Sequence, residues 1–163
     1  MNSDSKYAVI LTAVFGISAV ILQLTLTPLI EINGWHPDFV IVIILFLGKR
    51  FESISGSLAG FFLGIIQDSL SPLPLGISAL SKSIIGYAAG KTERFRFEGI
   101  LYYLWFLFLI FLNELIFYFF FQFKTTLSFD TLLFSRVFPN TLYTTLILFF
   151  AVNFIGKYFN EDN

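Results

Sequence analysis

The sequence SISGSLAGFFLGIIQD, residues 53–68, has a glycine at every fourth position, at Gly56, Gly60 and Gly64. Residues four apart lie on the same face of an α-helix, so this spacing places the three glycines on one side. Such a face weakens a helix in water. In a membrane it lets a second backbone approach closely, because lipid provides no hydrophobic force between helices. The segment therefore predicts a membrane helix that packs tightly against another helix.

The composition of the whole chain agrees with a membrane setting. Of the 163 residues 56% are hydrophobic and only 13% are charged, 23 are phenylalanine, and the mean hydropathy is +0.81. No soluble domain of this size has such a composition. The chain has no cysteine, which excludes disulfides and thiol chemistry. The first apolar stretch is too long for a cleavable signal peptide, so we expect it to remain as a membrane helix.

Apolar runs between polar breaks predict an all-α fold, an integral membrane six-helix bundle that forms a single transmembrane domain over residues 1–163. The second, third and fourth runs are short. At a rise of about 1.5 Å per residue, the second covers only about 16 Å of a hydrocarbon core about 30 Å thick. These central helices must therefore extend into their loops or lie shielded by protein. The six runs are Tyr7–Ile30, Asp38–Gly48, Ser53–Gln67, Leu75–Gly90, Gly99–Phe123 and Thr131–Lys157.

Basic residues are distributed unevenly between the two sets of connections. One set, which includes both ends of the chain, holds Lys6, Lys49, Arg50, Lys91, Arg94, Arg96 and Lys157, whereas the other holds only Lys124. Because Lys and Arg concentrate in cytoplasmic loops, this asymmetry predicts that both termini are cytoplasmic. The chain is then a multi-pass membrane protein.

Ionisable residues within the apolar runs are candidates for function, because charges are costly in lipid. Counting helical rise places Lys82, Glu114 and Arg136 at similar depths, with Asn113 and Asn140 beside them. We expect Glu114 to pair with Arg136 or Lys82. The cluster either holds the helices in one arrangement or forms a site for a ligand, a lipid headgroup or a partner helix.

Two features of the later spans predict further packing contacts. Gly86 and Gly90 form a second four-residue glycine repeat, which we expect to pack against the face of Gly56, Gly60 and Gly64. Pro139 removes one helical hydrogen bond near Ser135 and predicts a kink. The adjacent Arg136 either joins the charge cluster, extends outward to the interface or pairs with Asp130.

Catalytic chemistry finds little support in the sequence. His36 is the only histidine, and it is expected to be a solvated loop residue, so no metal-ligand set or Ser-His-Asp arrangement is recognisable. Asp38 is expected to cap a helix and Asp68 to bind loop amides, in preference to acid–base work. Neither a cofactor, a metal nor a nucleic-acid partner is predicted. An integral-membrane enzyme is the least favoured class.

The order of these motifs resembles the rod shape-determining protein MreD family. The resemblance spans Trp35 to Lys91 by motif and the whole chain by length and number of spans. It is carried by Pro37-Asp38, Lys49-Arg50, the three glycines with Gln67-Asp68, Leu75-Gly76, Ala79-Leu80, Gly86-Tyr87 and Gly90-Lys91.

The resemblance implies a non-enzymatic subunit of the bacterial cell-elongation machinery. Such a subunit would bind the bitopic protein MreC, and through it connect to MreB, RodA and its penicillin-binding transpeptidase. We expect the partner helix to dock in a groove of the short central helices, with Asp38 and Asp68 at the outer rim. The family is also similar in fold to the vitamin-binding S-components of energy-coupling-factor transporters. That similarity supplies the alternative, in which Lys82, Glu114, Arg136, Asn113 and Asn140 line a small-molecule pocket.

Overall fold

The computed structural model describes residues 3–71, 75–92 and 100–159, with side chains for residues 13–71, 75–92 and 100–153. These residues are helical and include no named strand, so the prediction of an all-α fold is confirmed. The elements are α1 (Ser3–Thr25), α2 (Thr27–Ile30), α3 (Phe39–Ser69), α4 (Ile77–Ala89), α6 (Ile100–Phe121), the 3₁₀ turn η1 (Gln122–Lys124), α7 (Phe129–Leu132), the π-helical turn η2 (Leu133–Val137) and α8 (Phe138–Phe159).

Helix α3 folds back on itself in the middle. Phe51 and Glu52 leave the helical conformation, and Glu52 has φ 70° and ψ 171°. A Cβ built on Gly56 would lie 2.7 Å from the Cα of Gly48, so the residues on either side of the break are in contact. The first half of α3 (residues 39–50) and its second half (residues 53–69) therefore form a helical hairpin. Its turn follows Lys49-Arg50, where the sequence predicts a boundary between two spans.

The glycine face of the second half of α3 packs against α4. A Cβ built on Gly56 would meet the backbone of Gly86, and one on Gly60 would meet the carbonyl of Lys82, each at less than 3.0 Å. Gly64 faces Ala79 in the same way. The helix contact that the two glycine repeats predict, including Gly86, is thus present in the structure. Gly90 extends it to the α3 turn, where a Cβ would meet the backbone of Ser53.

The first half of α3 lies at the centre of the molecule. Its residues Val40, Ile41, Ile44 and Leu45 are fully buried. Helix α1 covers one side through Ala19 and Val20, and α6 and α8 cover the other. Buried residues that complete this core are Leu63, Ile85, Ala89, Phe106, Leu109, Ile110 and Leu148.

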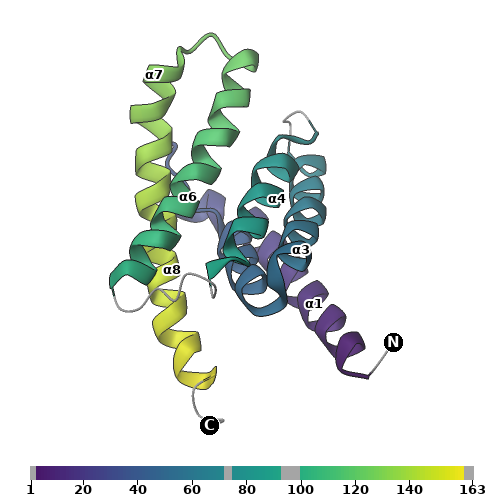
Figure 1. Ribbon diagram of the computed structural model, residues 1–163. Coiled ribbons are helices and arrows are strands. Elements are labelled where there is room, and N and C mark those ends of the chain that lie inside the picture. Colours follow the sequence, from purple (N-terminus) through teal and green to yellow (C-terminus); the bar gives the residue numbers. More distant parts are fainter. Residues whose placement is uncertain (1–2, 72–74, 93–99, 160–163) are drawn as a thin grey trace.

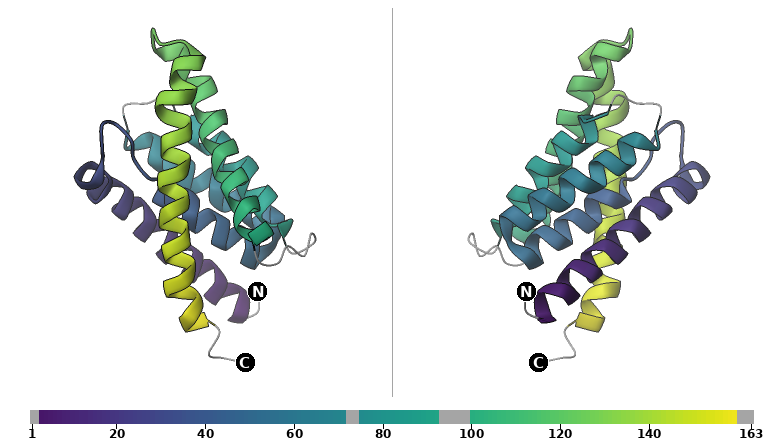
Figure 2. Two further views of the ribbon diagram at one scale, coloured as in Figure 1. Left: turned by 90° about the vertical axis from the view of Figure 1, so that its left-hand side faces the viewer. Right: turned by 90° about the vertical axis from the view of Figure 1, so that its right-hand side faces the viewer.

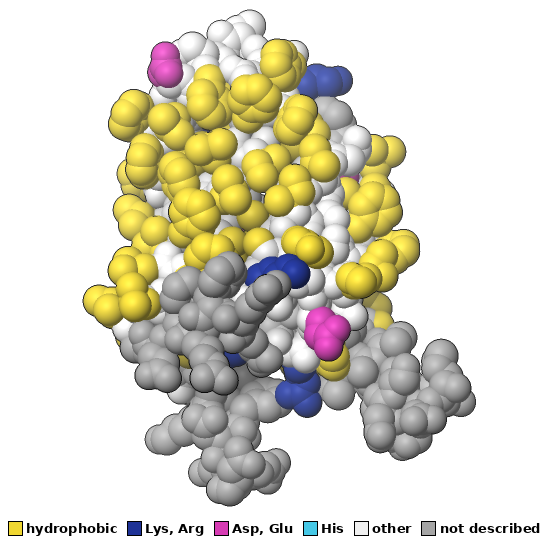
Figure 3. Space-filling view, in the orientation of Figure 1, with side chains coloured by type: hydrophobic (Ala, Val, Ile, Leu, Met, Phe, Trp, Pro, Cys, Tyr) yellow, Lys and Arg dark blue, Asp and Glu magenta, His cyan; other side chains and the backbone are white. Residues whose placement is uncertain are grey.

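Helices α6 and α8 run antiparallel, and α1 begins at the end of the molecule where α8 finishes (Figures 1 and 2). Two segments are long and apolar enough to cross a membrane, Ile100–Lys124 and Phe129–Asn153. On the face that Figure 3 draws, hydrophobic side chains form a broad band, and most of the visible charged groups lie above or below it. This is the pattern of a surface that faces lipid.

The last long helix is irregular where the sequence predicts it. A π-helical turn, Leu133–Val137, precedes Pro139. Because proline has no N–H, the Ser135 carbonyl lacks its helical donor four residues on. The indole nitrogen of Trp35 donates to this carbonyl at 2.9 Å. The irregular turn is therefore stabilised from outside by the segment that precedes α3.

Candidate functional site

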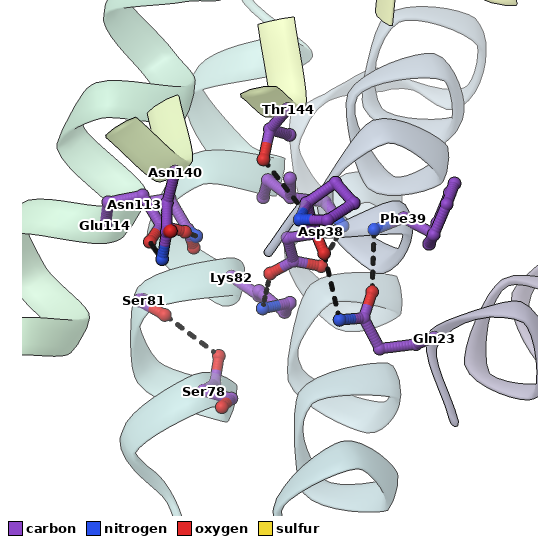
Figure 4. Close-up of polar contacts among 12 residues, drawn as sticks. Gln23, Asp38, Phe39, Ser78, Ser81, Lys82, Asn113, Glu114, Asn140 and Thr144 are labelled. Atoms are coloured by element: carbon purple, nitrogen blue, oxygen red, sulfur yellow. Dashed lines mark hydrogen bonds and ion pairs between the residues drawn. The ribbon is translucent and has the colours of Figure 1, made fainter. Parts of the chain in front are cut away.

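Polar side chains from five helical elements meet inside the apolar bundle. They come from α1, the start of α3, α4, α6 and α8, and Figure 4 shows them converging on Asp38 and on Glu114. We call this set the polar core. Its members are Gln23, Asp38, Lys82, Asn113, Glu114, Tyr118, Asn140 and Thr144.

Asp38 and Lys82 form a buried ion pair. The Lys82 Nζ lies 2.5 Å from the Asp38 Oδ2, and the two side chains are 2% and 9% exposed. The other carboxylate oxygen, Oδ1, accepts the Ile41 N–H at 3.0 Å, so Asp38 is also the N-cap that the sequence predicts. One carboxylate thus caps the central helix and neutralises a lysine that would otherwise be buried without a counter-charge.

Glu114 is bound by amides, which corrects the expected ion pair with Arg136 or Lys82. Its carboxylate accepts from the side-chain nitrogen of Asn113 at 3.3 Å and from that of Asn140 at 3.2 Å. Asn140 Nδ2 lies at the same distance from the Tyr118 hydroxyl. The predicted neighbours Asn113 and Asn140 are therefore the direct partners. Lys82 pairs with Asp38, which we expected at the outer rim of the docking groove.

Arg136 lies outside the polar core. It is half-buried and donates to the backbone carbonyl of Gly34. Gly34 has φ 82° and follows Asn33 with φ 54°, so the pair forms a tight turn closed by mutual hydrogen bonds between Ile32 and Trp35. The guanidinium therefore secures a loop, and the expectation that Arg136 joins Lys82 and Glu114 is wrong.

The segment of residues 31–38 is hydrogen-bonded along one side of α8. The His36 N–H donates to the Asn140 Oδ1 at 3.1 Å, and the Asp38 N–H donates to the Thr144 Oγ1 at 3.0 Å. Gln23 of α1 holds the same segment from the other side, accepting from the Phe39 N–H and donating to the Pro37 carbonyl. Neither Gln23 nor Thr144 was predicted from the sequence. Each is a polar residue in an otherwise apolar run, and this is the sequence feature that could have identified it.

His36 is less solvated than the sequence suggests. The residue is half-buried, and burial lowers the pKa of its imidazole despite the nearby Asp38 and Glu31 carboxylates. Its Nδ1 is buried and has no hydrogen-bond partner among the described residues. His36 is therefore partly shielded from solvent, which corrects the expected solvated loop histidine.

Asp68 organises the connection between α3 and α4. It is 1% exposed, and its carboxylate accepts the N–H groups of Gly76 at 2.8 Å and Ser78 at 3.1 Å. Loop hydrogen bonding is what the sequence predicts for this residue. Asp38 and Asp68 are both buried and bound internally, so neither lies exposed at an outer rim as expected.

The site holds no recognisable catalytic or metal-binding arrangement in the part of the chain that the structure describes. No group of three or more His, Asp or Glu side chains there could hold a metal ion. Most polar groups of the core are hydrogen-bonded to each other, although the Oδ1 of Asn113 is buried without a partner. Such an arrangement positions helices relative to one another.

An all-helical chain with a buried polar core, an apolar belt and two helices long enough to cross a bilayer is a helical membrane protein. The family model described as rod shape-determining protein MreD matches residues 3–161, nearly the whole chain. The protein therefore belongs to the MreD family, which gives it a role in determining rod shape. No curated protein and no solved structure gives a significant match to the chain.

Proposed function

We propose that this protein is a non-enzymatic scaffold subunit of the bacterial cell-elongation complex in the cytoplasmic membrane. It binds the bitopic protein MreC and through it connects to MreB, RodA and the penicillin-binding transpeptidase that organise peptidoglycan synthesis. The observation that carries the proposal is the match to the MreD family over residues 3–161. As a multi-pass protein with short loops, it acts through the surfaces that it offers within the membrane.

The polar core fits a scaffold better than a transporter or an enzyme. Each ionisable side chain in it already has an internal partner, with Lys82 bound to Asp38 and Glu114 bound to Asn113 and Asn140. A buried network in which nearly every group is bound fixes one helix arrangement. A rigid body of this kind presents a constant surface to its partners.

The seam between the second half of α3 and α4 is the surface that we assign to the MreC transmembrane helix. Ser57 and Ser83 lie half-buried in this seam, and their hydroxyls are hydrogen-bonded at 2.9 Å. Leu58 and Ile84 beside them are exposed. Small hydroxyl residues at a lipid-facing seam allow close helix approach and interhelical hydrogen bonds.

Co-purification tests this assignment. Replacing Ser83 with Phe fills the seam, so we expect MreC to be lost from the purified complex while the protein still inserts into the membrane. The matched control is Leu142→Phe, because Leu142 is 64% exposed on α8, away from the seam. If the Ser83 variant retained MreC, the assignment would be wrong and the docking surface would lie elsewhere on the protein.

Depletion of the protein separates the scaffold from the S-component alternative. As a scaffold, it should keep cells rod-shaped, so depleted cells should become round. The residues offered for a vitamin pocket are bound to other groups of the protein, including Arg136 to the Gly34 carbonyl. Depleted cells that kept their shape but lost uptake of one vitamin would overturn the scaffold proposal.

A further inference from the structure

The end of the molecule where α4 finishes and α6 begins carries a group of cations on two adjacent turns. Lys49 and Arg50 precede the α3 turn, and Lys91 follows α4. The turns are in contact, because a Cβ on Gly48 would lie 3.3 Å from the backbone nitrogen of Gly90. Figure 3 shows basic side chains gathered at this lower end. We call these three residues the basic end.

Aromatic rings lie beneath each of these cations. The Lys49 ammonium is 4.6 Å from the centre of the Tyr102 ring and 3.3 Å from its hydroxyl. The Lys91 ammonium is 5.1 Å from the centre of the Tyr87 ring, and Arg50 lies over Phe51. Because an ammonium has three donor hydrogens, one ring and one hydroxyl leave Lys49 with capacity for a further acceptor.

Charge is distributed differently at the opposite end. Among the residues whose side chains the structure describes, the basic end sets three cations against the single carboxylate of Glu52. The opposite end has Lys124 with the exposed carboxylates of Glu31 and Asp130, and its Arg136 is bound to a loop carbonyl. Of these described side chains, those at the basic end alone sum to a net positive charge.

Aromatic residues of the kinds that favour the membrane interface lie beside these cations. Tyr102 and Trp105 begin α6, and the Trp105 indole donates to the Thr92 hydroxyl at 3.1 Å, which joins α6 to the segment after α4. Tyrosine and tryptophan concentrate where the hydrocarbon core meets the headgroups. Lysines beside them are at the level of lipid phosphates, and basic pockets between helices bind such headgroups.

We infer that the basic end is a binding site for the headgroup of an anionic phospholipid, held by Lys49 and Lys91 above Tyr102 and Tyr87. A phosphate there bridges the α3 turn and the end of α4, and it anchors this end of the protein in an anionic leaflet. This site lies at the opposite end of α4 from the outer segment of residues 31–38 and does not depend on MreC binding.

Lipid retention of the purified protein tests the site. The protein is reconstituted in nanodiscs or mixed micelles containing phosphatidylglycerol or phosphatidylcholine, and bound lipid is counted by native mass spectrometry. We expect preferential retention of phosphatidylglycerol. Lys49→Gln and Lys91→Gln should each weaken it about fivefold, which is the contribution of one basic residue near an anionic surface. Lys124→Gln is the matched control and should change nothing.

Three results of the retention measurements would overturn the inference. They are equal retention of the two lipids by the unaltered protein, unchanged retention in the Lys49/Lys91 double variant, and an equal loss in the Lys124 control. Lys49→Arg keeps the charge and should retain the lipid, which separates loss of the site from misfolding. Displacement of the lipid by millimolar inorganic phosphate would identify a free anion site instead and would also contradict the inference.

Discussion

At the scale of single residues, the Asp38–Lys82 pair has the largest energetic consequence. Lys82→Met removes the cation and leaves a buried, uncompensated carboxylate, which typically costs about 3–5 kcal/mol. We expect a large fall in the unfolding midpoint of the purified protein, measured by thermal or denaturant unfolding in detergent.

The double variant Asp38→Asn/Lys82→Met is the control for this prediction. Asparagine still caps the helix that begins at Phe39, and no charge remains unpaired. The double variant should therefore be more stable than Lys82→Met alone. If the single and double variants were equally unstable, or if Lys82→Met left the unfolding midpoint unchanged, the two members of the ion pair would not be energetically coupled.

Glu52 gives a second prediction at the same scale. Its φ of 70° with ψ of 171° belongs to a region that glycine almost alone adopts. Glu52→Gly should relieve about 1–3 kcal/mol of strain and raise the unfolding midpoint. Glu52→Ala removes the same carboxylate but keeps a Cβ, so it should give no such gain. If Glu52→Ala raised the unfolding midpoint by the same amount, the stabilisation would come from removing the charge and not from relieving backbone strain.

At the scale of elements, the glycine contact between α3 and α4 leaves no room for side chains. A Leu at position 60 would collide with the backbone of Lys82 and Ser83, which cannot move without separating the helices. We expect Gly60→Leu to destabilise the protein by at least about 1–3 kcal/mol, as overpacking does, and to reduce its level in the membrane. Ser55→Leu is the control, because Ser55 is exposed on the same helix. Normal stability of the Gly60 variant would contradict this account of the packing.

The elements themselves were largely predictable from the sequence. Apolar runs bounded by polar residues gave six segments, and each corresponds to a helix, to one half of α3, or to a series of consecutive turns. The glycine repeat predicted the α3–α4 contact because four-residue spacing fixes a helix face. Pro139 predicted the irregular turn because a missing N–H leaves a free carbonyl.

The pairing inside the polar core was not predictable by the same means. Counting helical rise gives a depth for each residue but not the direction in which its side chain points. Each depth was also counted from the presumed outer end of its span. Asp38 instead begins α3 beside Lys82, five residues inside the start of α4 at Ile77. Lys82 therefore forms its ion pair with a carboxylate that was expected at the rim. The carboxylate of Glu114 is instead hydrogen-bonded by side-chain amides.

At the scale of the whole molecule, the arrangement of helices agrees with one orientation in the membrane. The start of α1, the α3 turn, the end of α4, the start of α6 and the end of α8 all lie at the end that carries Lys49, Arg50 and Lys91. Two other basic residues of the predicted cytoplasmic set, Arg94 and Arg96, lie outside the described residues. The positive-inside rule therefore predicts that the basic end is cytoplasmic.

This orientation predicts which sites a reagent reaches in intact cells. The chain has no cysteine, so single cysteines can be introduced without a background. Cysteines at Asn2 and Asp162 should react with a membrane-impermeant maleimide only after the cells are opened. A cysteine at Ser128, which is exposed in the connection between η1 and α7, should react in intact cells whose outer barrier admits the reagent. Because an even number of crossings places both ends on one side, labelling of exactly one terminus from outside would exclude six spans. Labelling of both termini would keep the bundle but reverse its orientation, and the basic end would then face away from the cytoplasm.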